Sequence, residues 1–481
     1  MPSFDIVGLP DASVRESRDR VRSAMKNNGF GSTSEKVTVN LAPADIKKVG
    51  PIYDLPILLS LAVAEGIITS DLSDSVFVGE LSLSGEVRPV RGLLSMAVRA
   101  QKCGYKRFYV PKAVATQAAV VKGIEIMPVT SVEQLIIHLT GGEQIVPMSH
   151  SVDFESETAH YLDFADVAGQ EYAKRAIEIA AAGGHNILLI GPPGSGKSML
   201  AKRIPSILPD MTFEEAIETT TIHSVAGQLS NDTPMITERP FRSPHHTVSA
   251  AALTGGGTTP IPGEISLAHN GVLFLDELPE FSRLALETLR QPLEDGVVSI
   301  ARVSGTLSYP CNTMFVAAMN PCPCGYFGHP TRKCTCSPQA VQRYLGRISG
   351  PLLDRMDIHV EVPPVAYDEL SSTQKAESSA DIKMRVNNAR KIQQKRFENT
   401  KIASNSNMTT AMLKEFCKLD GQASDYLGKS FERLGMSGRA YDRILKVART
   451  IADLESADNI TKSHIAQAIR LRSLDRKYWG G

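Results

Sequence analysis

Short apolar runs, each ending in glycine or a polar residue, predict buried strands in the middle of the chain. The runs "ILLI" at residues 187–190, "VLFL" at 272–275 and "MFVAAM" at 314–319 have the length and uniform hydrophobicity of core strands. The first run follows "EYAKRAIEIAAAGG", a helical pattern that ends at a glycine pair. Strands that alternate with helices in this way predict an α/β domain, which we place at residues 161–367.

The segments on either side of this domain have different patterns. Residues 1–145 alternate strand-like and helical runs, as in "KVTVNLAP" and "RFYVPKAVATQAAVV", which predicts an α+β domain. Residues 146–160 mix proline, serine and acidic residues without a period, which is typical of a linker. Residues 368–481 keep a helical composition and predict an all-helical domain.

Composition narrows the class of protein further. The 481 residues carry equal numbers of basic and acidic side chains, 52 of each, so any contact with nucleic acid has to be local. The longest apolar run, which begins at Leu55, is too short to span a bilayer, and the first residues lack the pattern of a signal peptide. We therefore expect a cytoplasmic protein without membrane contact. The seven cysteines, an odd number, argue against a disulfide framework and favour metal or core roles.

A phosphate-binding loop follows the first strand. The stretch "GPPGSGKS" fits the pattern G-x-x-x-x-G-K-[ST] and lies between a strand and a helix, as this motif requires. Its glycines let backbone N–H groups turn toward phosphates, Lys197 is expected to reach the β- and γ-phosphates, and the Ser198 hydroxyl to bind Mg²⁺. The predicted loop consists of Gly191, Pro192, Pro193, Gly194, Ser195, Gly196, Lys197 and Ser198.

Polar residues at the ends of the other two strands complete the candidate site. Asp276 and Glu277 follow the second strand, where we expect Asp276 to hold magnesium and Glu277 to activate water at the γ-phosphate. Asn320 follows the third strand and is placed to contact the γ-phosphate or the attacking water. In "LLDRMD", Arg355 precedes a further strand, and we expect it to stabilise phosphoryl charge in a neighbouring subunit.

Four cysteines follow Asn320 in "NPCPCGYFGHPTRKCTCSP". Their C-x-C-x₉-C-x-C spacing predicts a tetrahedral zinc site formed by Cys322, Cys324, Cys334 and Cys336. His329 is an alternative ligand for one position, and four reduced loop thiols are the alternative to a metal site. Cys103, Cys311 and Cys417 are isolated, and we expect core or surface roles for them.

These elements, in this order, resemble an AAA+ ATPase. The helical pattern "SGRAYDRILKVARTIADLE" resembles the lid helix that carries the second sensor arginine in that family, with Arg439 at the matching position and Arg443 as the alternative. The resemblance implies the fold class α/β, with an AAA+ P-loop NTPase core and a C-terminal helical lid. It also implies ATP and Mg²⁺ as ligands and a homo-hexameric ring in which each site takes its arginine from the next subunit.

Two further stretches narrow the resemblance to one branch of these ATPases. The glycine-rich "RPFRSPHHTVSAAALTGGGTTPIPGEISLAHN" resembles an insertion shared by magnesium-chelatase ATPase subunits and minichromosome-maintenance helicases. The stretch "DGVVSIARVSGTLSYPCN" resembles the hairpin before the first sensor in the same proteins. Such hairpins project into the pore of rings that thread DNA, so Arg302 is a candidate phosphate contact; a solvated hairpin charge is the alternative.

The N-terminal region resembles the proteolytic domain of Lon protease over "FVGELSLSGEVRPVRGLLSMAVRAQKCGYKRFYVPKAV". Lon needs a serine activated by a lysine, but the matching positions fall in the apolar "YDLPILL" and at Leu94. Ser60 and Lys106 are the other candidates, and neither matches the motif. We therefore expect a Lon-like domain without peptide hydrolysis.

A Lon-like domain joined to a chelatase-type AAA+ module resembles the ComM/YifB family over nearly the whole chain, including "FDIVGLPDASVRESRDRVRSA" and "VNLAPADIKK". The family usually has a further short segment before "FDIVGLPD", so we expect a shortened N-terminal domain. The resemblance implies an ATP-driven hexameric motor that acts on single-stranded and branched DNA and promotes branch migration during natural transformation. The alternatives are a protein-remodelling ATPase of magnesium-chelatase type and, disfavoured by the missing dyad, an ATP-dependent protease.

Overall fold

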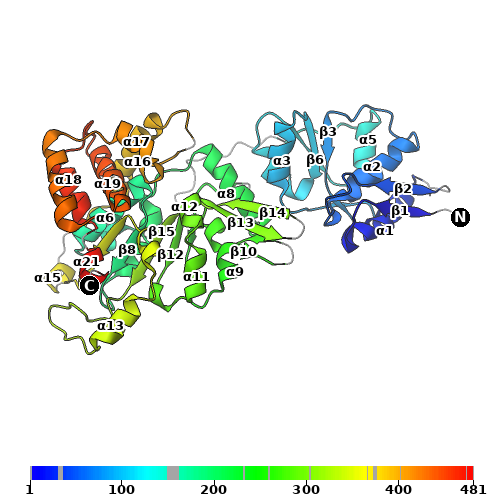
Figure 1. Ribbon diagram of the computed structural model, residues 1–481. Coiled ribbons are helices and arrows are strands. Elements are labelled where there is room, and N and C mark those ends of the chain that lie inside the picture. The colour runs from blue at the N-terminus through cyan, green and yellow to red at the C-terminus, as the bar shows by residue number, and fades with distance from the viewer. Residues whose placement is uncertain are drawn as a thin grey trace. The chain divides into compact units, whose positions relative to one another are not determined.

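The computed structural model divides into two units, which are described separately (Figure 1). The first comprises residues 1–157, 213–237 and 301–306, and the second comprises residues 158–212, 238–300 and 307–481. The structure describes residues 3–30, 36–148, 162–230, 233, 235–257, 260–302, 305–365, 367–371, 376–400, 402–472 and 474–479.

The first unit is built on three small sheets. Strands β3 (Ser75–Phe77), β6 (Arg107–Pro111) and β7 (Glu125–Val129) form a parallel sheet in that order. Strand β1 (Phe4–Val7) pairs in parallel with β2 (Val37–Asn40), and β4 (Glu80–Leu81) pairs with β5 (Val87–Arg88) in an antiparallel hairpin. The helices are α1 (Ala12–Asn27), α2 (Asp54–Ala64), α3 (Leu93–Lys102), α4 (Ala115–Ala119) and α5 (Val132–Leu139).

Helix α2 carries much of this unit's core, because its residues are apolar on almost every side. Leu55 and Leu58 are fully buried, and α2 packs against α1. Asp54, at the start of α2, is also buried and accepts hydrogen bonds from Arg20 at 2.6 and 3.0 Å. Leu94 of α3 is fully buried too. The matching positions for a protease dyad are therefore core positions.

Helix α8 (Phe213–Val225) belongs to the first unit by its contacts, although the sequence places it between strands of the second. It packs against α3, and the Lys122 ammonium lies 5.5 Å from the centre of the Phe213 ring. The Gln117 amide donates to the Ser230 carbonyl at 3.3 Å. Residues 213–237 thus connect covalently to the second unit at both ends while packing on the first.

The second unit contains a five-stranded parallel sheet between two helical layers (Figure 1). The strand order is β16 (Ile358–Glu361), β8 (Ile187–Ile190), β15 (Met314–Met319), β12 (Val272–Leu275) and β9 (Phe241–Arg242). The three apolar runs of the sequence are therefore the three central strands, and the predicted α/β core is confirmed.

Alternate residues of the central strands enter two different cores. Ile187 and Leu189 face a core formed with α6 (Glu171–Gly183), α16 (Ser379–Arg396) and α19 (Gly438–Leu454). Leu188 and Ile190 face a second core with helices α11, α13, α14 and α21. A strand buried on both faces has no polar alternation, which explains the uniform apolar runs. These four helices span Arg283–Thr288, Pro338–Leu345, Gly350–Leu353 and Leu474–Trp479, respectively.

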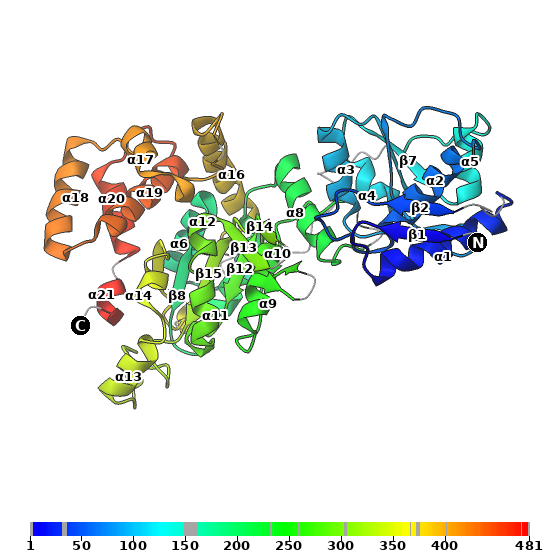
Figure 2. The same cartoon turned by 45° about the vertical axis from the view of Figure 1, so that its right-hand side comes forward.

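The C-terminal residues form a helical cluster, which both views show packed together (Figure 2). Besides α16 and α19 it contains α17 (Thr410–Phe416), α18 (Gly421–Leu434) and α20 (Lys462–Arg470). The shorter elements of the second unit are α7 (Lys197–Ala201), α9 (Ala250–Thr254), β10 (Gly255–Gly256), β11 (Ile261–Pro262), α10 (Glu264–Leu267), α12 (Pro292–Asp295) and α15 (Tyr367–Ser371). The hairpin strands β13 (Val297–Arg302) and β14 (Gly305–Pro310) contribute to both units. None of the helices described has the length and hydrophobicity to cross a bilayer.

Candidate nucleotide site

The candidate site lies at the carboxyl edge of the parallel sheet. The phosphate loop follows β8, Asp276 and Glu277 follow β12, and Asn320 follows β15. Because β15 pairs with both β8 and β12, the three strand ends are neighbours. Ligands of open α/β sheets bind at this edge, so the sequence pattern and the topology indicate the same place.

The phosphate loop has a backbone that its glycines make possible. Gly194 and Gly196 have φ angles of 77° and 91°, in the left-handed region that favours glycine. At Gly191 a Cβ atom would lie 2.2 Å from the Val362 carbonyl oxygen, so no side chain fits between the loop and β16. Gln170 holds the loop from outside, since its side-chain amide donates to the Pro363 carbonyl at 2.6 Å and to the Ser195 carbonyl at 3.4 Å.

Lys197 is the cation of the site and is almost fully buried. Its ammonium donates to the carbonyl oxygens of Gly191 and Pro192 at 2.8 and 2.9 Å and to Asn320 Oδ1 at 3.2 Å. Burial lowers the pKa of Lys197 to about 8, although the nearby carboxylates of Asp276 and Glu277 act in the opposite direction. A phosphate would supply the charge compensation that this desolvated cation lacks.

Ser198 and Asp276 form the part of the site suited to magnesium. The Ser198 hydroxyl donates to Asp276 Oδ2 at 2.5 Å, and the other carboxylate oxygen accepts from the Glu277 amide at 2.9 Å. A hydroxyl and a carboxylate that already meet are hard oxygen donors of the kind Mg²⁺ prefers, so these residues fit the predicted ion.

Glu277 stands at the end of β12 in a strained backbone conformation. Its φ angle is 53°, in the left-handed region that residues other than glycine rarely adopt. Its side chain is 58% exposed, and its carboxylate lies 3.5 Å from Nδ1 of His246, which belongs to the glycine-rich insertion. The sequence predicts the position of Glu277 but not its contact with His246. The paired histidines in the glycine-rich insertion are the sequence feature that could have indicated this contact.

The arginines predicted to act at the nucleotide lie at the opposite edge of the sheet. The Arg355 carbonyl accepts from the Asn186 amide at 3.0 Å, immediately before β8 begins. Its guanidinium pairs with Glu294 and donates to the Pro351 carbonyl at 2.7 Å. Arg439 is 68% exposed and lies 3.9 Å from Asp354. Since a four-residue strand is about 13 Å long, neither arginine meets the phosphate loop of its own chain.

Arg443, the alternative to Arg439, has a different environment. It donates at 2.7 Å to Asp357, whose other carboxylate oxygen lies 3.1 Å from His185 Nδ1. His185 Nε2 in turn lies 2.8 Å from the Thr450 hydroxyl of α19. Burial acts to raise the pKa of Asp357, but the histidine and the arginine outweigh it and hold this pKa well below its usual range. Arg443 therefore joins the helical cluster to the sheet.

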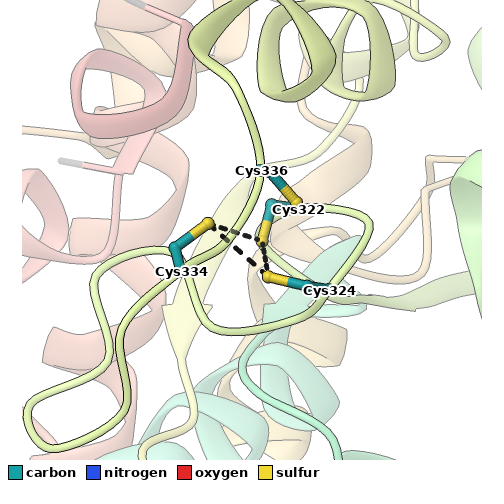
Figure 3. Close-up of side chains that lie close together, drawn as sticks. All are labelled: Cys322, Cys324, Cys334 and Cys336. Carbon is teal, nitrogen blue, oxygen red and sulfur yellow. Dashed lines mark hydrogen bonds between the residues drawn. The ribbon is translucent and has the colours of Figure 1, made fainter.

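The four predicted cysteine ligands come together directly after Asn320 (Figure 3). The sulfur of Cys322 lies 3.4 Å from that of Cys324 and 3.6 Å from that of Cys334, and Cys324 and Cys334 are 3.5 Å apart. All four ligand atoms, including that of Cys336, lie within 4.8 Å of one another. Tetrahedral zinc with bonds of about 2.3 Å separates its sulfurs by about 3.8 Å, so the cluster fits this ion.

The remaining residues that the sequence singled out lie outside the two groups described above. His329 does not join the cysteine cluster; its Nδ1 accepts from the amides of Thr331 and Arg332 at 3.2 and 3.0 Å. Among the isolated cysteines, Cys311 and Cys417 are buried, and Cys103 is exposed. Arg302 ends β13, and its side chain lies outside the described residues.

The cysteine loop touches the phosphate loop, a contact that the sequence does not predict. At Gly325, between the second and third cysteines, a Cβ atom would lie 2.4 Å from Pro193 Cδ. The Phe327 amide donates to the Cys322 sulfur at 3.3 Å and closes the turn around this glycine. The cysteine loop thus lies against the predicted phosphate loop.

Comparisons with known proteins agree with this architecture. Residues 163–370 match the family model described as magnesium chelatase, subunit ChlI. Residues 1–114 match subunit ChlI of Mg-chelatase, and residues 376–472 match the ChlI C-terminal model.

The sequence similarity to two relatives extends over almost the whole chain. The chain is 44% identical to YifB of Escherichia coli over 478 residues, covering 99% of this chain and 92% of that protein. It is 42% identical to competence protein ComM of Haemophilus influenzae over 481 residues, covering 99% and 93%. A shorter match, 29% identical over 153 residues, covers 29% of this chain and 26% of Lon protease 2 of Bacillus subtilis. The chain therefore belongs to the ComM/YifB family of magnesium-chelatase-related AAA+ proteins.

Proposed function

We propose that this chain is an ATP-driven motor that acts on single-stranded and branched DNA and promotes branch migration while incoming strands are integrated. ATP hydrolysis is supported by the carboxyl edge of the sheet, where Lys197, Asp276, Glu277 and Asn320 meet. DNA as the substrate is supported by the similarity to competence protein ComM along almost its entire length, because competence is the capacity to take up DNA.

The residues at this edge divide the reaction between them. Loop amides and Lys197 hold the phosphates, and Asn320, which already accepts from Lys197, orients the attacking water. Glu277 takes a proton from this water as its oxygen bonds to the γ-phosphorus and the bond to the β,γ-bridging oxygen breaks. Magnesium, held by Ser198 and Asp276, would neutralise charge on the phosphate oxygens.

In a ring, a neighbouring subunit would supply further positive charge to the phosphates. Arg355 and Arg439 lie at the amino edge of the sheet, so a neighbour stacked head to tail would bring them to the carboxyl edge of the next subunit. Arginine suits this role because it stays charged and binds phosphate oxygens in pairs. We propose a homo-hexamer on this basis, as the family resemblance implies.

Zinc in the cysteine cluster is part of the same proposal. The four sulfurs lie within 4.8 Å of one another, close enough to bind one tetrahedral ion, and the loop that carries them between residues 322 and 336 has no helix or strand of its own. A metal would fix this loop against Pro193 and thereby support the phosphate loop. Metal analysis of protein purified without chelator should find about one zinc per chain, and an absence of metal would refute this part.

A protein-remodelling ATPase is the second candidate, favoured by the match to the magnesium-chelatase model over residues 163–370. Proteolysis is disfavoured by the contacts of the two alternative dyad residues. The Ser60 hydroxyl donates to the Pro56 carbonyl at 2.8 Å within α2, whereas Lys106 lies 3.5 Å from Asp74. Neither contact activates a nucleophile.

The decisive experiment measures ATP turnover without polymer, with single-stranded DNA, with a four-way DNA junction and with an unfolded protein, and follows junction dissociation in the same samples. Stimulation by DNA together with ATP-dependent dissociation supports the motor. Stimulation by unfolded protein alone would refute the DNA proposal and favour remodelling. Lys197→Ala should abolish ATP binding, whereas Glu277→Gln should bind ATP without turnover.

A further inference from the structure

Residues 471–479, which end in α21, lie along β16, the strand at one edge of the five-stranded sheet. The amide of His359 in β16 donates to the Leu471 carbonyl at 2.6 Å. Leu474 and Tyr478 of α21 are buried in one of the two cores that flank the sheet. The segment therefore occupies part of a sheet edge that would otherwise face solvent.

Helix α21 also binds the carboxyl end of β16, where the phosphate loop begins. The Lys477 ammonium lies 2.6 and 2.7 Å from the two carboxylate oxygens of Glu361, the last residue of β16, and the Tyr478 hydroxyl donates to one of them at 3.3 Å. The next residue touches the phosphate loop, since a Cβ atom at Gly191 would lie 2.2 Å from the Val362 carbonyl oxygen. Only one residue thus separates the contact with α21 from the contact with the loop.

The chain after β16 is joined to the phosphate loop a second time. The Gln170 amide donates to the Pro363 carbonyl at 2.6 Å and to the Ser195 carbonyl at 3.4 Å. A shift of residues 361–363 would therefore be passed to the beginning and to the middle of the phosphate loop.

The cysteine loop is another support of the phosphate loop, and α21 contacts it as well. The ring centroids of Phe327, in the cysteine loop, and Tyr478 are 6.3 Å apart. Nε1 of Trp479 donates to the carbonyl of Leu345, the last residue of α13, at 3.3 Å, and α13 follows the cysteine loop directly. The same loop approaches the phosphate loop at Gly325. Tyr478 therefore contacts both structures against which the phosphate loop rests.

We propose that residues 471–479, the β16 clasp, position the phosphate loop for ATP, with Lys477 and Tyr478 as positioning residues that act through Glu361 and the cysteine loop. The inference rests on the proposed role of the phosphate loop in binding ATP. Because the docked clasp and bound ATP favour the same loop conformation, each strengthens the other. Loss of the clasp contacts therefore weakens ATP binding.

Charge reversal at the ion pair tests this inference. An exposed ion pair contributes little by itself, but two like charges at the same distance repel each other. Lys477→Glu and Glu361→Lys should each raise the Kd of a fluorescent ATP analogue about 3- to 30-fold. The double variant restores opposite charges and should return to within about threefold of the wild type. Lys106→Glu reverses the same charge in an ion pair of the first unit, with Asp74, and should change the Kd less than about twofold.

Trp479 offers a second readout that does not depend on activity. It is the only tryptophan of the chain and is half-buried, so intrinsic fluorescence reports on the clasp without a label. Lys477→Glu should shift its emission to longer wavelengths because the ring becomes more exposed. Saturating ATP should reverse part of this shift, but not in Lys477→Glu protein that also carries Lys197→Ala.

The outcomes separate this inference from the proposed function, with thermal unfolding measured for each variant. If Lys197→Ala alone binds the analogue as tightly as the wild type, the proposed nucleotide site fails and the inference falls with it. If Lys197→Ala loses binding but both charge reversals keep wild-type affinity, only the inference is overturned. It is also overturned if the double variant binds no better than the single ones, if Lys106→Glu loses as much affinity, or if ATP leaves the emission of Lys477→Glu unchanged. A lower melting temperature with unchanged affinity would show that the clasp only covers the sheet edge.

Discussion

One added carbon atom, the Cβ of Gly325→Ala, should disrupt the contact between the cysteine loop and the phosphate loop. Gly325 approaches Pro193 so closely that an added Cβ would lie 2.4 Å from Pro193 Cδ and 2.7 Å from Cγ. Gly328, three residues further in the same loop, offers a matched control. Both glycines have positive φ angles, 83° and 76°, but around Gly328 the nearest atom to an added Cβ is 3.9 Å away, on Lys477.

The two substitutions share one energetic cost and differ in another. Alanine in the left-handed region costs about 1–2 kcal/mol, and this applies to Gly325→Ala and Gly328→Ala alike. Carbon atoms in contact settle about 3.5–4.0 Å apart, so Gly325→Ala must also push the two loops apart by about 1 Å. Because Pro193 belongs to the phosphate loop, that shift should lower kcat/KM for ATP about 10- to 100-fold.

The assay compares ATP turnover, the affinity for a fluorescent ATP analogue, zinc content and melting temperature in both variants and the wild type. We expect a similar small loss of stability in both, but a large loss of kcat/KM only in Gly325→Ala. If the two variants hydrolyse ATP equally well, the close approach to Pro193 does not support the phosphate loop. If Gly325→Ala also loses its zinc, the test is repeated with metal restored, and recovered turnover would again contradict the reasoning.

Three further predictions concern the sheet edge and the cysteines. Asp357→Asn should lower the free energy of unfolding by about 3–5 kcal/mol, because it breaks a buried ion pair. Since the pKa of Asp357 is lowered in the folded state, the difference in melting temperature from wild type should persist above about pH 4. The difference should shrink below that pH as the carboxyl is protonated. Arg355→Ala should bind ATP without turnover, and mixing it with Lys197→Ala should restore some hydrolysis. Mixtures that hydrolyse no more ATP than the two variants do separately would refute action in trans. Cys322→Ser should lose bound zinc and lower the melting temperature, whereas Cys103→Ser, an exposed control, should do neither.

The meeting of the candidate residues at the carboxyl edge of the sheet could be predicted from sequence because its signals are local. The loop spacing, the apolar runs and the polar residue after each run all lie within short windows, and parallel pairing then brings the strand ends together. The cysteine cluster was predictable for the same reason, since one loop carries all four ligands.

Contacts between distant segments could not be read in this way. His246 reaches Glu277 across 31 positions of chain, Gly325 reaches Pro193 across 132, and no periodic pattern specifies either meeting. Residues 213–237 show the same limit, because their local helical signal does not reveal that α8 packs on the first unit. In each case the tertiary fold, rather than local propensity, chooses the partner.

The placement of the arginines bears on how copies of the proposed ring would meet. A parallel sheet has two unlike edges, and here the phosphate loop occupies one while Arg355 and Arg439 occupy the other. A symmetric dimer that joins like edges could not bring these arginines to a phosphate, because it would pair phosphate loops with phosphate loops or arginines with arginines. A head-to-tail arrangement presents the amino edge of one copy to the carboxyl edge of the next, and such arrangements close as rings or continue as filaments. The buried network around Asp357, which binds the helical cluster to the amino edge, would then present both arginines to the neighbour as one rigid surface.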